Sequence, residues 1–160
     1  MQFLNYFLTA LISYIGLFAG MLLIFMGPEE KKPGEKYFRI MQDVVLFLVM
    51  FFLFFNLKLN YFWVSFLMVI VLLVLIWYRA KKIDKVENQF VVYTLFGIVL
   101  HLSLINAEFL ITEASLIFLY GMATGSLLTN SKKKFESVKN VLKYSYFILV
   151  AMLPFLFSKP

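Results

Sequence analysis

Long apolar segments alternate with short polar ones along the whole chain. Each apolar segment is long enough, or nearly so, to cross about 30 Å of hydrocarbon as an α-helix that rises about 1.5 Å per residue. The segments cover residues at about 3–26, 40–57, 60–78, 89–106, 109–129 and 141–157. This pattern predicts an all-α fold, a polytopic integral membrane protein whose single domain, residues 1–160, is a six-helix transmembrane bundle.

Two pairs of apolar segments are separated by very few polar residues. Residues 40–78 and 89–129 would each form a helix of roughly 60 Å without a turn, twice the thickness of the hydrocarbon core. We therefore expect the chain to reverse at residues 56–60 and at residues 106–108. The first apolar segment has no basic residue ahead of it and no convincing small-residue cleavage site, so we expect a retained span.

The amino-acid composition is typical of a membrane protein, and it excludes every function that needs a cysteine. Hydrophobic residues make up 62% of the chain and charged residues only 15%, in clusters between the apolar segments. A soluble domain of this length would need far more polar surface. The absence of cysteine excludes disulfides, thiolate nucleophiles and cysteine metal ligands.

Basic residues fall almost entirely in three connections. Those after the first, third and fifth apolar segments carry every lysine and arginine except Lys58 and Lys159. Because cytoplasmic loops retain positive charge, we predict that these connections are cytoplasmic and that both termini lie outside a plasma membrane. We expect the basic loops to contact anionic lipid headgroups and not nucleic acid, since they lie beside apolar segments.

The longest polar stretch, residues 27–39, belongs to the first of these connections. Pro28 is expected to begin a short helix, and Pro33 with Gly34 is expected to form a turn. We interpret the stretch as a solvated connector beside the headgroups, with a docking surface for a protein partner as the alternative.

Two pairs of glycines four residues apart lie in the first and fifth apolar segments. Gly16 and Gly20 form one pair, and Gly121 and Gly125 form the other. Small residues at this spacing allow the backbones of membrane helices to approach closely. Each pair either accepts some neighbour within the bundle, or the first and fifth helices pack on one another or on a second protomer of a homo-oligomer.

Ionisable residues inside the apolar segments are the main candidates for function. His101 and Glu113 each lie six residues from the turn expected near Ala107, about 9 Å below its tip. A charged carboxylate in hydrocarbon is costly, so Glu113 should point into the bundle, take a proton, or pair with His101. Two interpretations stay open: the two side chains have only structural roles near the headgroups, or they form a functional site in which they share one proton.

Other polar residues extend this candidate substrate- or proton-binding site. Asn5 and Thr9 of the first helix reach the same depth, and Tyr120 lies on the same face of the fifth helix as Glu113. Gln42, by contrast, is expected near the cytoplasmic surface with a structural role in the first turn of its helix. Pro154 is expected to kink the last helix.

The residue types present favour transport or assembly over catalysis. His101, Glu108 and Glu113 do not have the spacing of a zinc site on one helical face, and no metal or other cofactor is expected. An enzyme, such as an intramembrane lipid-modifying one, is the less favoured reading. We therefore expect a transporter or channel for a small solute or ion, or a non-catalytic subunit or scaffold of a membrane-protein complex.

Overall fold

Helices form the described part of the protein, which in this computed structural model comprises residues 3–56, 70, 87–130 and 133–157. No strand occurs in those ranges, in agreement with the predicted all-α fold. The α-helices and short 3-10 helices (η) are α1 (Phe3–Met26), η1 (Pro28–Glu30), α2 (Lys31–Asn56), α4 (Glu87–Leu102), η3 (Ser103–Ile105), α5 (Ala107–Leu128), α6 (Lys134–Leu142), η4 (Lys143–Ser145) and α7 (Tyr146–Phe157).

Within the described residues, three helical segments are long and apolar enough to cross a membrane: α1, residues 28–55, and α5. This length and composition indicate membrane association. The expected span at residues 60–78 lies outside the described residues, as does most of the expected turn at residues 56–60.

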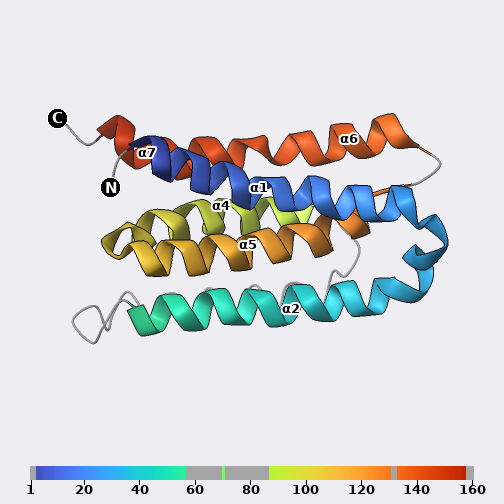
Figure 1. The fold of residues 1–160 in the computed structure, drawn as a ribbon, viewed down its shortest axis with the longest axis horizontal. Coiled ribbons are helices and arrows are strands. Elements are labelled where there is room, and N and C mark those ends of the chain that lie inside the picture. The colour runs from blue at the N-terminus through green and yellow to red at the C-terminus, as the bar shows by residue number, and fades with distance from the viewer. Residues whose placement is uncertain (1–2, 57–69, 71–86, 131–132, 158–160) are drawn as a thin grey trace.

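The helices run side by side along one long axis (Figure 1). α5 lies at the centre, where it packs against both α1 and α2, and α4 packs against α7. The start of α1, the end of α7 and the α4–α5 turn lie at one end, here called the terminal end (Figure 1). The α1–α2 and α5–α6 connections lie at the opposite end, here called the basic end because of its lysines.

Helix α2 begins earlier than the sequence pattern suggests. Pro33 and Gly34 lie inside its first turns and do not form the expected turn. The proline is tolerated there because the first N–H groups of a helix have no intrahelical partner to lose. An ion pair of 2.8 Å between Arg39 and Glu35, one turn apart, supports the same segment.

The reversal expected at residues 106–108 is present. After α4 the chain forms the 3-10 helix η3, and Asn106 then adopts an extended conformation that ends the helix. Its side chain accepts a hydrogen bond of 2.9 Å from the backbone N–H of Glu108, which makes it the N-cap of α5.

The last helical segment begins at Lys134, well before the expected residue 141, and η4 interrupts it. It lies antiparallel to α1 over its whole length. The Tyr14 hydroxyl donates to the Val141 carbonyl at 3.1 Å, close to the break, and that of Tyr6 donates to Ala151 at 3.0 Å. These bonds satisfy backbone carbonyls around an irregular helix, which an apolar environment requires. α7 continues through Pro154 to its end at Phe157.

Candidate functional site

The contact between α1 and α5 is a direct contact of backbones. A Cβ atom added to Gly16 would overlap the carbonyl oxygen of Phe118, and one added to Gly20 would overlap that of Met122. From the first contact to the second, the residue number rises by four on both helices, so the two helices are parallel. The Ser126 hydroxyl adds a buried hydrogen bond of 3.0 Å to the Gly20 carbonyl.

The glycines of α5 complete this seam. A Cβ on Gly121 would lie 3.0 Å from the backbone nitrogen of Leu17, and one on Gly125 would overlap the Leu17 carbonyl oxygen. The structure therefore places the two glycine pairs against each other, within one chain. The same register makes Glu113 level with Leu11, in the middle third of the 24-residue α1.

Glu113 is fully buried there, with 0% of its surface exposed. Within the described part of the chain, neither of its carboxyl oxygens has a hydrogen-bond partner, and Nδ1 of His101 also lacks one. No hydrogen bond therefore joins the two residues expected to share a proton. Gly97 lies one turn before His101 and packs against Val150 of α7. Because residues four apart share one face of a helix, the half-buried His101 lies on the side of α4 that faces α7.

The remaining residues of the predicted site lie elsewhere. Asn5 is exposed, and the half-buried Thr9 donates its hydroxyl to the Asn5 carbonyl at 2.8 Å. Thr9 also lines an apolar groove of about 460 Å³ beside the α1–α5 seam, together with Ala114 and Ser115. Tyr120 belongs to a separate group of polar side chains nearer the basic end.

That group, here called the polar layer, consists of Gln42, Gln89, Tyr93, Tyr120 and Thr124. The Gln42 side chain is 1% exposed, and its Nε2 donates to Thr124 Oγ1 at 2.7 Å, which links α2 to α5. The Tyr120 hydroxyl donates to Gln89 Oε1 at 2.9 Å, which links α5 to α4. The Tyr93 hydroxyl is buried and has no hydrogen-bond partner in the described residues.

Sequence reasoning missed the role of Gln42 because it considered only the residue's distance from the helix start. A usable signal was present in the helical period. Gln42 is separated by seven residues from Val49 and by eleven from Leu53, and both of these are buried. A polar residue at the same period as core residues belongs to the inward face of its helix.

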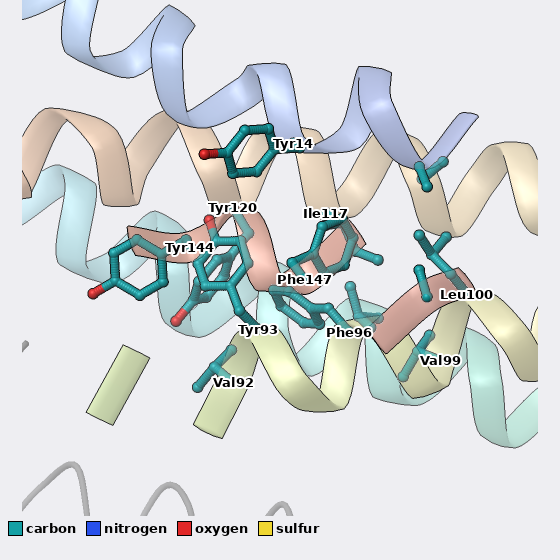
Figure 2. Close-up of a cluster of buried hydrophobic side chains, with 14 of the residues drawn as sticks. Tyr14, Val92, Tyr93, Phe96, Val99, Leu100, Ile117, Tyr120, Tyr144 and Phe147 are labelled. Carbon is teal, nitrogen blue, oxygen red and sulfur yellow. The ribbon is translucent and has the colours of Figure 1, made fainter. Parts of the chain in front are cut away.

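The tyrosines of this region direct their polar atoms toward one side (Figure 2). Tyr93 and Tyr144 pack with ring centroids 5.1 Å apart, and Tyr93 and Tyr120 with centroids 6.1 Å apart. Their hydroxyl oxygens lie on the side of the cluster away from Val99 and Leu100 (Figure 2). The hydroxyls are therefore turned toward the basic end.

An apolar layer separates the polar layer from Glu113. Buried Phe96 and Ile117 form it, and the Phe96 ring packs edge-on against Tyr120 with centroids 4.9 Å apart. Glu113 lies seven residues from Tyr120, about 10 Å along the helix axis. The described helices therefore hold two buried polar positions at different depths.

A charged surface level with the middle of α1 is the last feature. Lys139 and Lys143 are exposed and Asn140 is half-buried on one side of α6, here called the α6 face. The Tyr14–Val141 hydrogen bond places this face beside the middle of α1. A lysine at the centre of a bilayer costs roughly 2.5–3.5 kcal/mol on the insertion scale, so contact with bare lipid is unfavourable.

The sequence pattern assigns Lys139 and Lys143 to a loop. In the structure, Lys139 lies in α6 and Lys143 in η4, both beside α1. No ion pair neutralises either of them in the described structure, and the nearby Glu136 is paired with Lys133 at 3.0 Å.

The described ranges contain no group of three side chains able to hold a metal ion. The chain matches no protein-family model, no curated protein and no solved structure. Function is therefore inferred from the buried polar groups themselves.

Proposed function

We propose that this chain is a multi-pass plasma-membrane protein that transports a small solute or ion, with Glu113 binding and releasing a proton during transport. The observation that carries the proposal is the fully buried Glu113 carboxyl, which has no partner in the described residues. A carboxylate without a donor in an apolar place is strongly disfavoured, so the group takes up a proton or a cation. If residue 113 had only a structural role, a leucine there would make the fold more stable than a glutamate does.

The arrangement of the two polar positions supports a carrier over an open channel. A permanently open pore needs a continuous polar lining, whereas buried Phe96 and Ile117 lie between the depth of Glu113 and that of the polar layer. A carrier opens to one side at a time and keeps an apolar barrier on the other. The interrupted segment α6–η4–α7 is also a feature that transporters use near their sites.

The proposal includes six spans with both termini outside. The α1–α2 and α5–α6 connections gather at the basic end, and the positive-inside rule assigns that end to the cytoplasm. Anionic headgroups of the inner leaflet would then contact the lysines of these connections.

One observation favours the alternative of a non-catalytic subunit or scaffold. The α6 face carries two exposed lysines at membrane depth, and an acidic helix of another membrane protein would neutralise them. A protein of this kind would have no proton-binding cycle at Glu113, so one experiment separates the two functions.

The test combines chemical labelling with proton flux. N,N′-dicyclohexylcarbodiimide modifies protonated carboxyl groups in apolar sites, and mass spectrometry of the reconstituted protein should locate the modification at Glu113. Proteoliposomes carrying a pH dye should show proton entry under an imposed membrane potential, and Glu113→Gln should abolish it. Glu108→Gln, the same change at the exposed start of α5, is the matched control and should keep the flux.

Two outcomes would contradict the proposal. An unmodified Glu113 would mean that the carboxyl is not held protonated in an apolar place. Equal proton flux in wild type and Glu113→Gln, or no flux in either, would mean that Glu113 carries no proton across the membrane.

A further inference from the structure

The α6 face lies deep in the bundle. Three contacts set the register of α6–η4–α7 against α1: the Tyr14 and Tyr6 hydroxyl bonds to Val141 and Ala151, and Lys134 Nζ 5.7 Å from the Phe25 ring centroid. Because these contacts span nearly the whole of α1, the residues between them lie at the depth of its apolar middle.

The two sides of the bundle at this depth have different chemistry. On α1, exposed side chains such as Ile15 and Leu22 suit lipid. On α6, Lys139 and Lys143 are one turn apart and exposed, with Asn140 between them. Two ammonium groups at this spacing repel one another, and lipid tails offer neither water nor counter-ions to screen them.

We infer that the α6 face lines a water-filled vestibule that opens at the basic end, reaches the middle of the membrane, and receives a small anionic solute. This inference rests on the proposed transport function and names its substrate class. Water would solvate the ammonium groups, and the two lysines together would attract a carboxylate or phosphate group. The Asn140 amide adds a hydrogen-bond donor that is not charged.

The polar layer lies next to this vestibule. Tyr144 of η4 is buried immediately after Lys143, and its ring packs on Tyr93, whose hydroxyl has no partner in the described structure. Tyrosine hydroxyls donate hydrogen bonds to anions without adding positive charge. Behind the α6 face, the buried tyrosine hydroxyls are directed toward the basic end (Figure 2).

The absence of cysteine allows a direct test of both water access and charge selection. Asn140→Cys places one thiol on the α6 face and keeps both lysines. In proteoliposomes, it is treated with two methanethiosulfonates of similar size, the anionic 2-sulfonatoethyl reagent and the cationic 2-(trimethylammonium)ethyl reagent. Each rate is expressed relative to the rate of the same reagent with a free thiol in solution, because a thiolate itself favours the cationic reagent. On this scale we expect reaction from the side of the basic end, with the anionic reagent faster by on the order of tenfold.

Matched variants identify the cause of that ratio. Adding Lys139→Gln and Lys143→Gln to Asn140→Cys should bring the two rates close together. Phe135→Cys, at the exposed start of α6, should react with both reagents, and Leu149→Cys, on the exposed apolar side of α7, should react with neither. If Asn140→Cys does not fold, Lys143→Cys reports on the same face, with Lys139 still present.

The inference is overturned if the thiols of Asn140→Cys and Lys143→Cys remain unreactive while that of Phe135→Cys reacts, since the face would then be sealed by protein or lipid. It is also overturned if the cationic reagent reacts as fast as the anionic one, or if removing the lysines leaves the ratio unchanged. Carbodiimide labelling of Glu113 is a separate measurement, so failure of the vestibule and failure of the proton site are distinguishable.

Discussion

At the scale of single residues, the chemistry of Glu113 and His101 is best tested by apolar replacement. No hydrogen bond joins the two side chains, so the stability changes of Glu113→Leu and His101→Leu should be additive in the double variant. The shared proton expected from the sequence predicts non-additive changes instead. Thermal unfolding in detergent of the two single variants and the double variant measures this directly.

Glu113→Leu alone should stabilise the fold, because it removes a buried group whose oxygens make no hydrogen bond in the described structure. The cost of such an unsatisfied group is about 1–3 kcal/mol. A lower melting temperature for Glu113→Leu would show that the carboxyl has a partner in the folded protein.

The Gln42–Thr124 bond also belongs to this scale. Gln42→Leu and Thr124→Val each remove one side of a buried bond of 2.7 Å between helices. Their double-mutant cycle should give a coupling free energy of about 0.6–1.7 kcal/mol, the range found for hydrogen bonds between membrane helices. Zero coupling would mean that the two groups are bonded to other partners.

At the scale of helices, the α1–α5 seam should be the most sensitive contact to an added methyl group. Gly20→Ala places a Cβ on the Met122 carbonyl, so the helices must separate, at a cost of roughly 1–3 kcal/mol. Gly27→Ala is the matched control, because its nearest contact would be an ordinary 3.7 Å. Unfolding measurements that find equal stability for the two variants would contradict the observed seam.

The tyrosine bonds to the interrupted helix operate at the same scale. Tyr14 and Tyr6 are eight residues apart on one face of α1, and each reaches a carbonyl of α6 or α7. This explains how α1 supports a segment whose own hydrogen bonding is disturbed at η4 and at Pro154.

At the scale of the whole molecule, the predicted topology can be checked with two single cysteines. Lys58→Cys and Lys133→Cys should react with an impermeant maleimide from opposite sides of the membrane, because the predicted topology assigns the first to an outer connection and the second to a cytoplasmic one. Lys36→Cys serves as the control for the cytoplasmic side. Reaction of positions 58 and 133 from the same side would contradict the odd number of spans predicted between them.

Much of this architecture follows from sequence pattern alone. Apolar length and the lack of water in a bilayer leave helices as the available structure, and for that reason the bounds of α1 and the reversal at Asn106 are predictable. Helical period likewise identifies Gly16, Gly20 and Glu113 as residues of interest. These inferences need only properties that act within one segment.

Contacts between segments required the tertiary structure. The sequence does not specify how far one helix slides along another, and that register decides what each polar side chain meets. It brings Gln42 to Thr124 and leaves His101 and Glu113 without a hydrogen bond to each other. It also places Lys143, expected in a loop, in η4 beside the middle of α1. Between α1 and α5, close packing of the backbones at the glycines sets this register.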